Sequence, residues 1–234
     1  MARVILIKHD DEPCDDRVSA WFAAQGIECD WRYPYRGDVL GPVEDDVVAT
    51  VLYGGPDLIS ETSRHPHIVM EAAWILDCIA RGLVVLGFCQ GAQVIAYALG
   101  APTAPSSDGR CEFGYYPLRV TAAGAAYIPD GLHVCQSHFH EFAIPEGAEL
   151  LASSDSFGHQ AFSYGGRVWA FQFHPEITPV GFRRWQDIFW APYGRPGAQT
   201  RGHQDELMAR HDATQHDWMY GFLDGTVLPL LAVA

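Results

Sequence analysis

Residues 83–93 read LVVLGFCQGAQ, and this stretch decides the fold class. The apolar run at 83–88 predicts a strand buried in a parallel sheet, and a helical pattern follows directly after Cys89. Gly87 and Gly91 flank the cysteine, because larger side chains would clash in so sharp a turn; this is the arrangement of a nucleophile elbow. The sulfur would also lie near a helix N-terminus, where the positive end of the dipole favours thiolate over thiol. The alternative is a buried cysteine that simply ends a strand.

Similar strands and helices alternate on the N-terminal side of this stretch. Short apolar runs at 3–7 and 47–53 predict two more buried strands. Each is followed by a helical pattern, the first from about 16 to 25 and the second with an apolar stripe that includes Val69 and Leu76. Strands that alternate with helices in this way favour a parallel sheet covered on both faces.

Strand patterns dominate the middle of the chain, from about 115 to 173. They occur at 118–121, 133–137, 149–152, 161–164 and 167–173. The last two flank Gly165-Gly166, the best hairpin turn in the sequence. We therefore expect an antiparallel excursion from the parallel sheet.

The C-terminal part returns to helices. Thr178-Pro179 has the pattern of an N-cap followed by a first-turn proline, so a helix is expected to begin there. That helix should bury the apolar residues Val180, Phe182, Trp185, Ile188 and Phe189. A last helix is expected from about 204, and the apolar end at 226–234 should pack on the core, or alternatively on a partner. With no linker or repeat in view, we expect one domain over 1–234, with a C-terminal helix and tail at 203–234.

The composition argues against several classes of protein. The 15 basic and 29 acidic residues give a net charge of −14, and so acidic a surface repels nucleic acid and anionic lipid. No apolar run approaches the roughly 18 residues of a membrane span, and the N-terminus lacks a signal-peptide core, so a cytoplasmic protein is expected. The six cysteines show neither a CxxC pair nor zinc-type spacing, which favours free thiols.

A histidine suited to serve a thiolate lies far downstream of Cys89. Residues 171–176 read FQFHPE, so His174 ends an apolar strand. Alternate residues of an extended segment share a face, and Glu176 can therefore reach the same imidazole. His174 would then transfer protons while Glu176 fixes its tautomer. Taken alone, His-Pro-Glu is more often a simple turn at the end of a strand.

Together, these two segments resemble the class I, triad-type glutamine amidotransferases, whose hallmarks are G-x-C-x-G-x-Q and a downstream H-P-E. Further segments match the family's oxyanion strand, a segment of its free-standing members, its substrate-contacting strand and a strand before a hairpin. These are LYGGP at 52–56, EFGYYP at 112–117, QSH at 136–138 and QAF at 160–162. The likeness covers about 3–190, and it implies a flavodoxin-like, three-layer α/β fold with a mostly parallel central sheet.

The resemblance also implies a role for each matching residue. Cys89 would attack the γ-amide of glutamine or of a related γ-glutamyl compound, His174 would protonate the leaving ammonia or amine and then activate water, and Glu176 would orient His174. The backbone N–H groups of Gly55 and Gln90 would hold the oxyanion. The amino-acid part of the substrate would contact Gly54, Gln93, Ser137 and His138. The resemblance implies no cofactor and no metal.

Two features leave the substrate open. Family members often have an aspartate two residues after the histidine of the S-H pair, where this chain has His140 and then Glu141. His138 and His140 alternate onto one face and, with a third ligand, would suit a metal, although no metal belongs to the family's chemistry. The acidic residues at 10–16 are best explained as a solvated loop and a helix start, with a substrate contact as the alternative.

Three functions remain open within this resemblance, and a related chaperone or protease with a cysteine elbow is a fourth, against which the HPE at 174–176 argues because that group lacks it. The first is a free-standing hydrolase of glutamine or a γ-glutamyl amide, favoured by EFGYYP at 112–117. The second is a subunit that passes ammonia to a separate synthetase in trans and works only beside it. The third is a non-catalytic binding module that keeps the fold, against which the intact Cys89, His174 and Glu176 argue.

Overall fold

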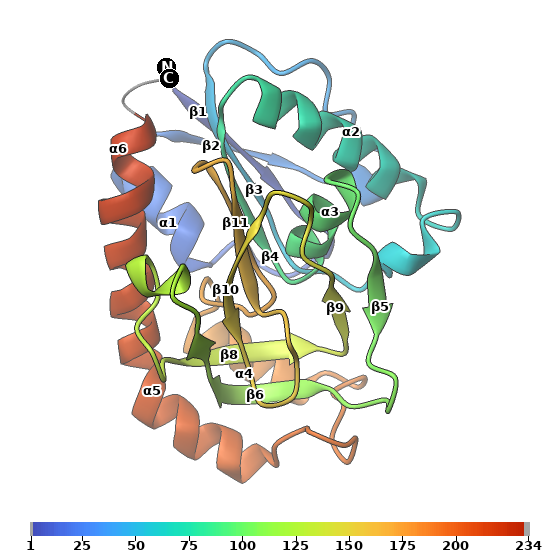
Figure 1. The fold of residues 1–234 in the computed structure, drawn as a ribbon, viewed down its shortest axis with the longest axis vertical. Coiled ribbons are helices and arrows are strands. Elements are labelled where there is room, and N and C mark those ends of the chain that lie inside the picture. Colours follow the sequence, from blue (N-terminus) through green and yellow to red (C-terminus); the bar gives the residue numbers. More distant parts are fainter. Residues whose placement is uncertain (1, 232–234) are drawn as a thin grey trace.

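The computed structural model describes residues 2–231 of the 234, and an eight-stranded sheet lies at its centre (Figure 1). Five parallel strands run in the order β2-β1-β3-β4-β12, and three antiparallel strands continue the sheet as β11-β10-β7. Their bounds are β1 Arg3–Ile7, β2 Glu28–Arg32, β3 Val47–Leu52, β4 Val84–Phe88, β7 Arg119–Val120, β10 Glu149–Ser153, β11 Ala161–Tyr164 and β12 Val168–Phe171. The expected fold class, a mostly parallel sheet with an antiparallel excursion, is confirmed.

Helices cover both faces of the sheet and complete three layers (Figure 1). The helices α1 (Arg17–Ala24) and α5 (Arg201–Phe222) lie on one face, and α2 (Pro66–Ala80) and α3 (Gln90–Ala98) lie on the other. Successive side chains of a strand point to opposite faces, so each strand supplies both cores. In β1, Val4 and Leu6 join the core beneath α1 and α5, whereas Ile5 and Ile7 join the core beneath α2 and α3.

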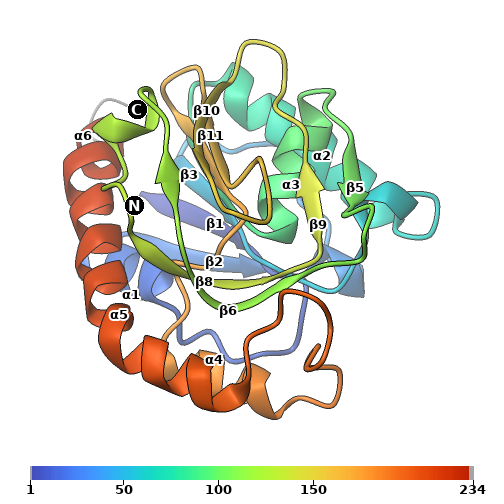
Figure 2. The same ribbon diagram turned by 60° about the horizontal axis from the view of Figure 1, so that its bottom comes forward.

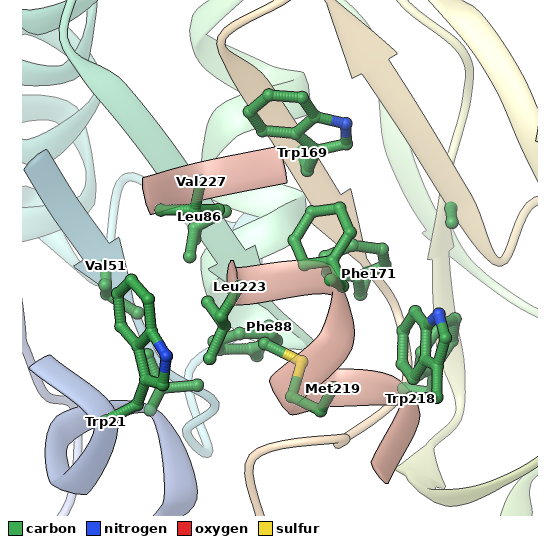
Figure 3. Close-up of a cluster of buried hydrophobic side chains, with 14 of the residues drawn as sticks. Trp21, Val51, Leu86, Phe88, Trp169, Phe171, Trp218, Met219, Leu223 and Val227 are labelled. Carbon is green, nitrogen blue, oxygen red and sulfur yellow. The ribbon is translucent and has the colours of Figure 1, made fainter. Parts of the chain in front are cut away.

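The C-terminal segment belongs to the first of these cores. Leu223, Val227 and Leu231 are buried there, in a π-helical turn (Leu223–Val227) and the short α6 (Leu228–Leu231). Figure 3 shows Leu223 and Val227 beside Leu86 and Phe88 of the sheet. The apolar end therefore packs on the core as expected up to residue 231, and 232–234 lie outside the described residues. No helix within 2–231 is both long and apolar enough to cross a membrane.

The middle of the chain adds two small antiparallel sheets (Figure 2). β6 (Glu112–Pro117) pairs with β8 (His133–His138), and β5 (Thr103–Pro105) pairs with β9 (His140–Phe142). Helix α5 braces β8, because the side-chain oxygen of Gln215 accepts a hydrogen bond from the Cys135 amide at 2.6 Å. The predicted hairpin joins β11 to β12, and Gly165 and Gly166 have φ of 60° and 69°, as a type I′ turn requires.

Some local details differ from the sequence-based expectation. Helix α4 (Pro179–Asp187) begins after the capping Thr178 as predicted, but Ile188 is already extended, so Phe189 lies beyond the helix and is 98% exposed. Val180, in the first turn of α4, is also exposed. The buried stripe expected in α2 is also wrong, because apolar residues occur all around this helix. Its buried side carries Ile68, Ala72 and Ile75, whereas Val69 and Leu76 face solvent. Strand β2 escapes prediction because its sequence, ECDWR, is largely polar.

Candidate active site

Cys89 lies in the sharp turn between β4 and α3, as the elbow pattern predicts. Its φ of 49° and ψ of −109° make it the only residue other than glycine with a positive φ within 2–231. Such a backbone conformation is strained in an L-residue, and it persists here because the Cys89 amide donates to the carbonyl of Phe171 at 2.8 Å. A Cβ at Gly91 would collide with the Leu52 carbonyl, so this glycine allows α3 to start close to β3.

His174 follows β12 and forms a buried pair with Glu176. Its Nδ1 lies 2.8 Å from a carboxylate oxygen of Glu176, while its Nε2 is buried without a hydrogen-bond partner. Arg17, at the start of α1, braces this turn: its amide donates to the Glu176 carbonyl at 2.9 Å and its guanidinium to the Pro175 carbonyl at 3.3 Å. The Trp185 ring meets the imidazole edge-on, with 4.7 Å between ring centroids. These contacts fix the ring plane and leave one nitrogen free for chemistry.

The electrostatics of this pair favour the imidazolium. Burial lowers the pKa of His174, but the negative charges of Glu176 and then Cys89 outweigh it and raise the pKa to about 10. The protonated ring is therefore the dominant form at neutral pH. A cationic imidazole beside a sulfur stabilises thiolate, the reactive form of cysteine.

Gly54 and Gly55 follow β3 after Tyr53, and neither has room for a side chain. A Cβ on Gly54 would come within 2.8 Å of His174 Cε1 and 3.6 Å of Cys89 Cβ, so this backbone borders both residues. A Cβ on Gly55 would collide with His9 and with the side chain of Gln90. Neither the Gly55 amide nor the Gln90 amide donates a hydrogen bond to another group within 2–231. Both residues line the same cavity as Cys89, so their two unused N–H groups are candidate donors for an oxyanion hole.

The four residues expected to contact the substrate also lie at this site. Gln93, in the first turn of α3, is buried and donates to the side-chain oxygen of Gln172 at 3.1 Å. The Ser137 carbonyl lies 3.7 Å from the Cys89 sulfur. All nine residues expected at the site line one cavity of about 720 Å³. They are Cys89, His174, Glu176, Gly54, Gly55, Gln90, Gln93, Ser137 and His138.

His138 contributes its backbone to the cavity while its ring is fully engaged. Nδ1 lies 2.9 Å from the His140 carbonyl and Nε2 lies 3.2 Å from the buried carboxylate of Glu112. Ser154 and Gln160 also donate to that carboxylate, both at 2.7 Å. The metal alternative for His138 and His140 would require these contacts to break. Residues 2–231 contain no group of three or more His, Cys, Asp or Glu placed to hold a metal.

The outer part of the cavity is acidic and aromatic. The loop at 10–16 is largely exposed, as expected of a solvated loop, and it also lines the mouth of the cavity, where the alternative of a substrate contact would place it. Arg184 of α4 holds this loop through Glu12 at 2.8 Å and Asp15 at 2.7 Å, and Asp16 caps α1. The walls include the aromatic rings of Trp31, Phe139, Trp185 and Trp190.

The sequence argument missed several residues around the site. Arg17 and Trp185 act on the turn that carries His174, and the ion pair of Arg17 with Asp212 at 2.6 Å ties that turn to α5. His9 and Glu71 form a second buried pair behind Gly55. The one signal for His9 is its place directly after the first strand, where parallel sheets present functional side chains.

Comparison with known proteins agrees with this geometry. The family model "Glutamine amidotransferase class-I" matches residues 34–184. The glutamine amidotransferase-like protein YfeJ of Salmonella typhimurium is 29% identical over 184 residues, which cover 75% of this chain and 76% of that protein. The glutamine-hydrolysing GMP synthase of Marinobacter nauticus is 37% identical over 142 residues, 55% of this chain, but the match spans only a quarter of that synthase.

Solved structures share the fold of this chain. A glutamine amidotransferase from Thermotoga maritima superposes with a TM-score of 0.84 at 24% identity, covering 97% of this chain and 98% of that one. The protein SMU.1228c superposes with a TM-score of 0.83 at 26% identity, covering 96% of this chain and 99% of that one. The family model matches most of this chain, and the two solved structures share its fold over nearly the whole length. The chain therefore belongs to the class I glutamine amidotransferase family.

Proposed function

We propose that this protein hydrolyses the γ-amide of glutamine or of a related γ-glutamyl compound through a cysteine thioester. The observation that carries the proposal is the meeting of three features in one cavity: the strained Cys89, the His174–Glu176 pair and the unused amides of Gly55 and Gln90. Each matches a requirement of acyl transfer, namely a nucleophile, an oriented proton carrier and donors for the oxyanion.

The proposed reaction has two halves. In the first, the Cys89 sulfur forms a bond to the γ-carbonyl carbon, and the tetrahedral oxyanion is held by the amides of Gly55 and Gln90. The C–N bond then breaks, and His174 supplies the proton with which ammonia or an amine leaves. In the second half His174 removes a proton from water, the hydroxyl oxygen attacks the thioester, and the acid and free Cys89 are released. Glu176 keeps the imidazole oriented throughout.

The cavity supports a substrate that extends beyond the γ-amide itself. Its volume of about 720 Å³ lies within the range of pockets that enclose drug-sized ligands, and aromatic rings and an acidic loop continue it past the sulfur. Glutamine is small for this space. A γ-glutamyl amide with a substituted amine on nitrogen would use more of it, so both substrates belong in the test.

The test is an assay of the purified chain without any added synthetase. Ammonia, amine and glutamate are followed with glutamine and with a panel of γ-glutamyl amides. We expect slow hydrolysis by the wild type and none by Cys89→Ala, while Cys29→Ala, which removes a half-buried thiol outside the cavity, serves as the matched control and keeps activity. A glutamine-like diazoketone should label Cys89 in preference to the other five cysteines. Full activity in Cys89→Ala would refute the proposal.

A second candidate is an ammonia-supplying subunit that is active only beside a synthetase. The relatives named GMP synthase favour it, and so do exposed apolar side chains near the cavity mouth: Phe189 is 98% exposed, Trp190 50% and Phe139 37%. Under this alternative the isolated chain would hydrolyse no member of the panel, although the diazoketone would still label Cys89.

A further inference from the structure

His9 and Glu71 form a sealed ion pair directly behind the candidate oxyanion hole. His9 follows β1 and Glu71 lies in α2, and both side chains are fully buried. His9 Nε2 lies 2.9 Å from one oxygen of Glu71, and His9 Nδ1 lies 3.0 Å from the backbone carbonyl of Tyr53. Because neither side chain lines the cavity, the pair cannot touch a substrate there.

The partners of His9 decide where its protons lie. A backbone carbonyl can only accept a hydrogen bond, so Nδ1 must carry a proton and donate it to Tyr53. Glu71 meets the other nitrogen, and its second oxygen is buried without a partner. A buried ion pair is a poor source of stability compared with apolar side chains of similar volume. Stability alone therefore does not explain this pair, and the backbone that it holds in place offers a better explanation.

Three elements meet at the Tyr53 carbonyl. Tyr53 connects the end of β3 to Gly54 and Gly55, and its carbonyl accepts hydrogen bonds from His9 Nδ1 and from the amide of Gly91 in α3, each at 3.0 Å. The first bond comes from the end of β1, and the second from the helix that carries Gln90. One carbonyl thus fixes the strand that supplies the Gly55 amide relative to the helix that supplies the Gln90 amide.

Packing adds a second contact from the same histidine. The hypothetical Cβ of Gly55 would collide with His9 Cβ, so the Gly55 backbone lies directly on the His9 side chain. On its other side, Gly55 meets the side chain of Gln90, whose oxygen accepts from the Asp57 amide at 2.9 Å. Rotation of the Gly54–Gly55 peptide would have to displace one of these neighbours.

We propose that His9 and Glu71 are positioning residues that hold Tyr53–Gly55 in register with α3, so that the amides of Gly55 and Gln90 point at one oxyanion. This inference rests on the proposed function. The Tyr53 hydrogen bond supplies the restraint, and Glu71 orients the ring that makes it. Without the imidazole, the Gly54–Gly55 peptide samples other orientations and the Gly55 donor is lost for part of the time.

The test uses three substitutions that divide the contacts of His9. His9→Asn keeps an N–H close to the position of Nδ1, His9→Gln keeps one close to Nε2, and His9→Ala removes both. A lost oxyanion donor lowers kcat by roughly 10²- to 10³-fold in comparable acyl-transfer sites. We expect His9→Ala to lower kcat by up to about 10²-fold with KM changed less than about threefold, and His9→Asn to recover more of kcat than His9→Gln.

Two controls separate positioning from simple loss of stability. Ile75→Ala removes a fully buried side chain one turn further along α2 and outside the cavity. It should lower Tm at least as much as His9→Ala while kcat at 25 °C is unchanged. The amide NMR signals of Gly54 and Gly55 give a readout without turnover: they should broaden or shift in His9→Ala and return toward wild type in His9→Asn.

The outcomes are distinguishable. If wild type and Ile75→Ala are active and His9→Ala keeps kcat within about threefold, or if KM alone rises, the positioning role is wrong while the proposed function stands. If wild type hydrolyses nothing, the proposed function fails, and the NMR comparison still decides whether His9 holds the segment. Unchanged glycine signals in His9→Ala would overturn the inference in either case.

Discussion

Two buried histidine–glutamate pairs adjoin Gly54-Gly55, with His174 against Gly54 and His9 against Gly55, and one difference between them matters for chemistry. The N···O distances are 2.8 Å for His174–Glu176 and 2.9 Å for His9–Glu71, and both pairs are buried. The difference is the second ring nitrogen. Nε2 of His174 has no hydrogen-bond partner, and His174 lines the cavity. Nδ1 of His9, in contrast, is hydrogen-bonded to the Tyr53 carbonyl.

We infer from this comparison that the second ring nitrogen, rather than the pair itself, sets the role of each histidine. A histidine with one unoccupied nitrogen in a cavity can exchange a proton with a substrate. A histidine whose two ring nitrogens are both hydrogen-bonded within the protein can orient its partners, but it has no nitrogen available to exchange a proton with a substrate. The third buried pair, His138–Glu112, belongs to the second type, since its other nitrogen meets the His140 carbonyl.

The largest expected effect tests this distinction directly. His174→Ala removes the imidazole whose Nε2 has no partner, and it should lower kcat by at least about 10⁴-fold. The loss is large because no other group in the site would take over proton transfer to and from the nucleophile's substrate. His9→Ala should stay at or above about one hundredth of wild-type kcat. Steady-state rates with the best substrate of the panel check both values. Equal losses in the two variants would contradict the comparison.

Substitution of the two glutamates should lower kcat in the same order as substitution of their histidines, but by smaller factors. Glu176→Gln leaves the His174 imidazole in place and should retain at least about tenfold more activity than His174→Ala. Glu71→Gln keeps an oxygen that can accept from His9 Nε2, so its effect on kcat should be smaller than that of Glu176→Gln. The same assay measures both, with the Tm of each variant as the control for folding.

A titration should sharpen the contrast at His174. Its pKa of about 10 means that the ring stays protonated through neutral pH and loses its proton only near pH 10. Glu176 supports this against burial, which lowers the pKa, so Glu176→Gln should shift the titration to lower pH. Cys89→Ala should lower it too, because Cys89 also raises the pKa of His174. Imidazole ¹⁵N NMR from pH 5 to 11 gives the values, and an unchanged titration in Glu176→Gln would contradict the role given to this carboxylate.

The smallest effect concerns the backbone between the two pairs. Gly55→Ala introduces a Cβ that meets His9 and Gln90, and overpacking of this kind costs about 1–3 kcal/mol of unfolding free energy. Gly202, in the first turn of α5, has open space around its Cβ position, so Gly202→Ala should be neutral or stabilising by up to ~1 kcal/mol. Denaturant unfolding of both variants checks the prediction. A neutral Gly55→Ala would mean that His9 does not confine the segment.

Much of the fold follows from local patterns in the sequence. The apolar runs that became β1, β3 and β4 are short and continuous because strands buried on both faces need no polar alternation. Gly165-Gly166 and Thr178-Pro179 determine a turn and a helix start through backbone preferences of their own. The buried stripe of α2 and the exposure of Phe189 depend on which neighbours cover them, and no local pattern records that.

For the candidate site, the sequence by itself singled out Cys89, His174 and Glu176. The elbow around Cys89 and the His-Pro-Glu turn are local constructions, in which spacing of a few residues dictates strand end, sharp turn and shared face. Only the tertiary structure decided which histidines meet which carboxylates across the chain. His9 and Glu71 are paired because the end of β1 and one turn of α2 converge behind Gly55, and His138 and Glu112 because β8 pairs with β6. Two residues that are far apart in the sequence have no fixed spacing, so no local pattern records that they pair. Their interaction is defined only once the packed chain brings the two groups together.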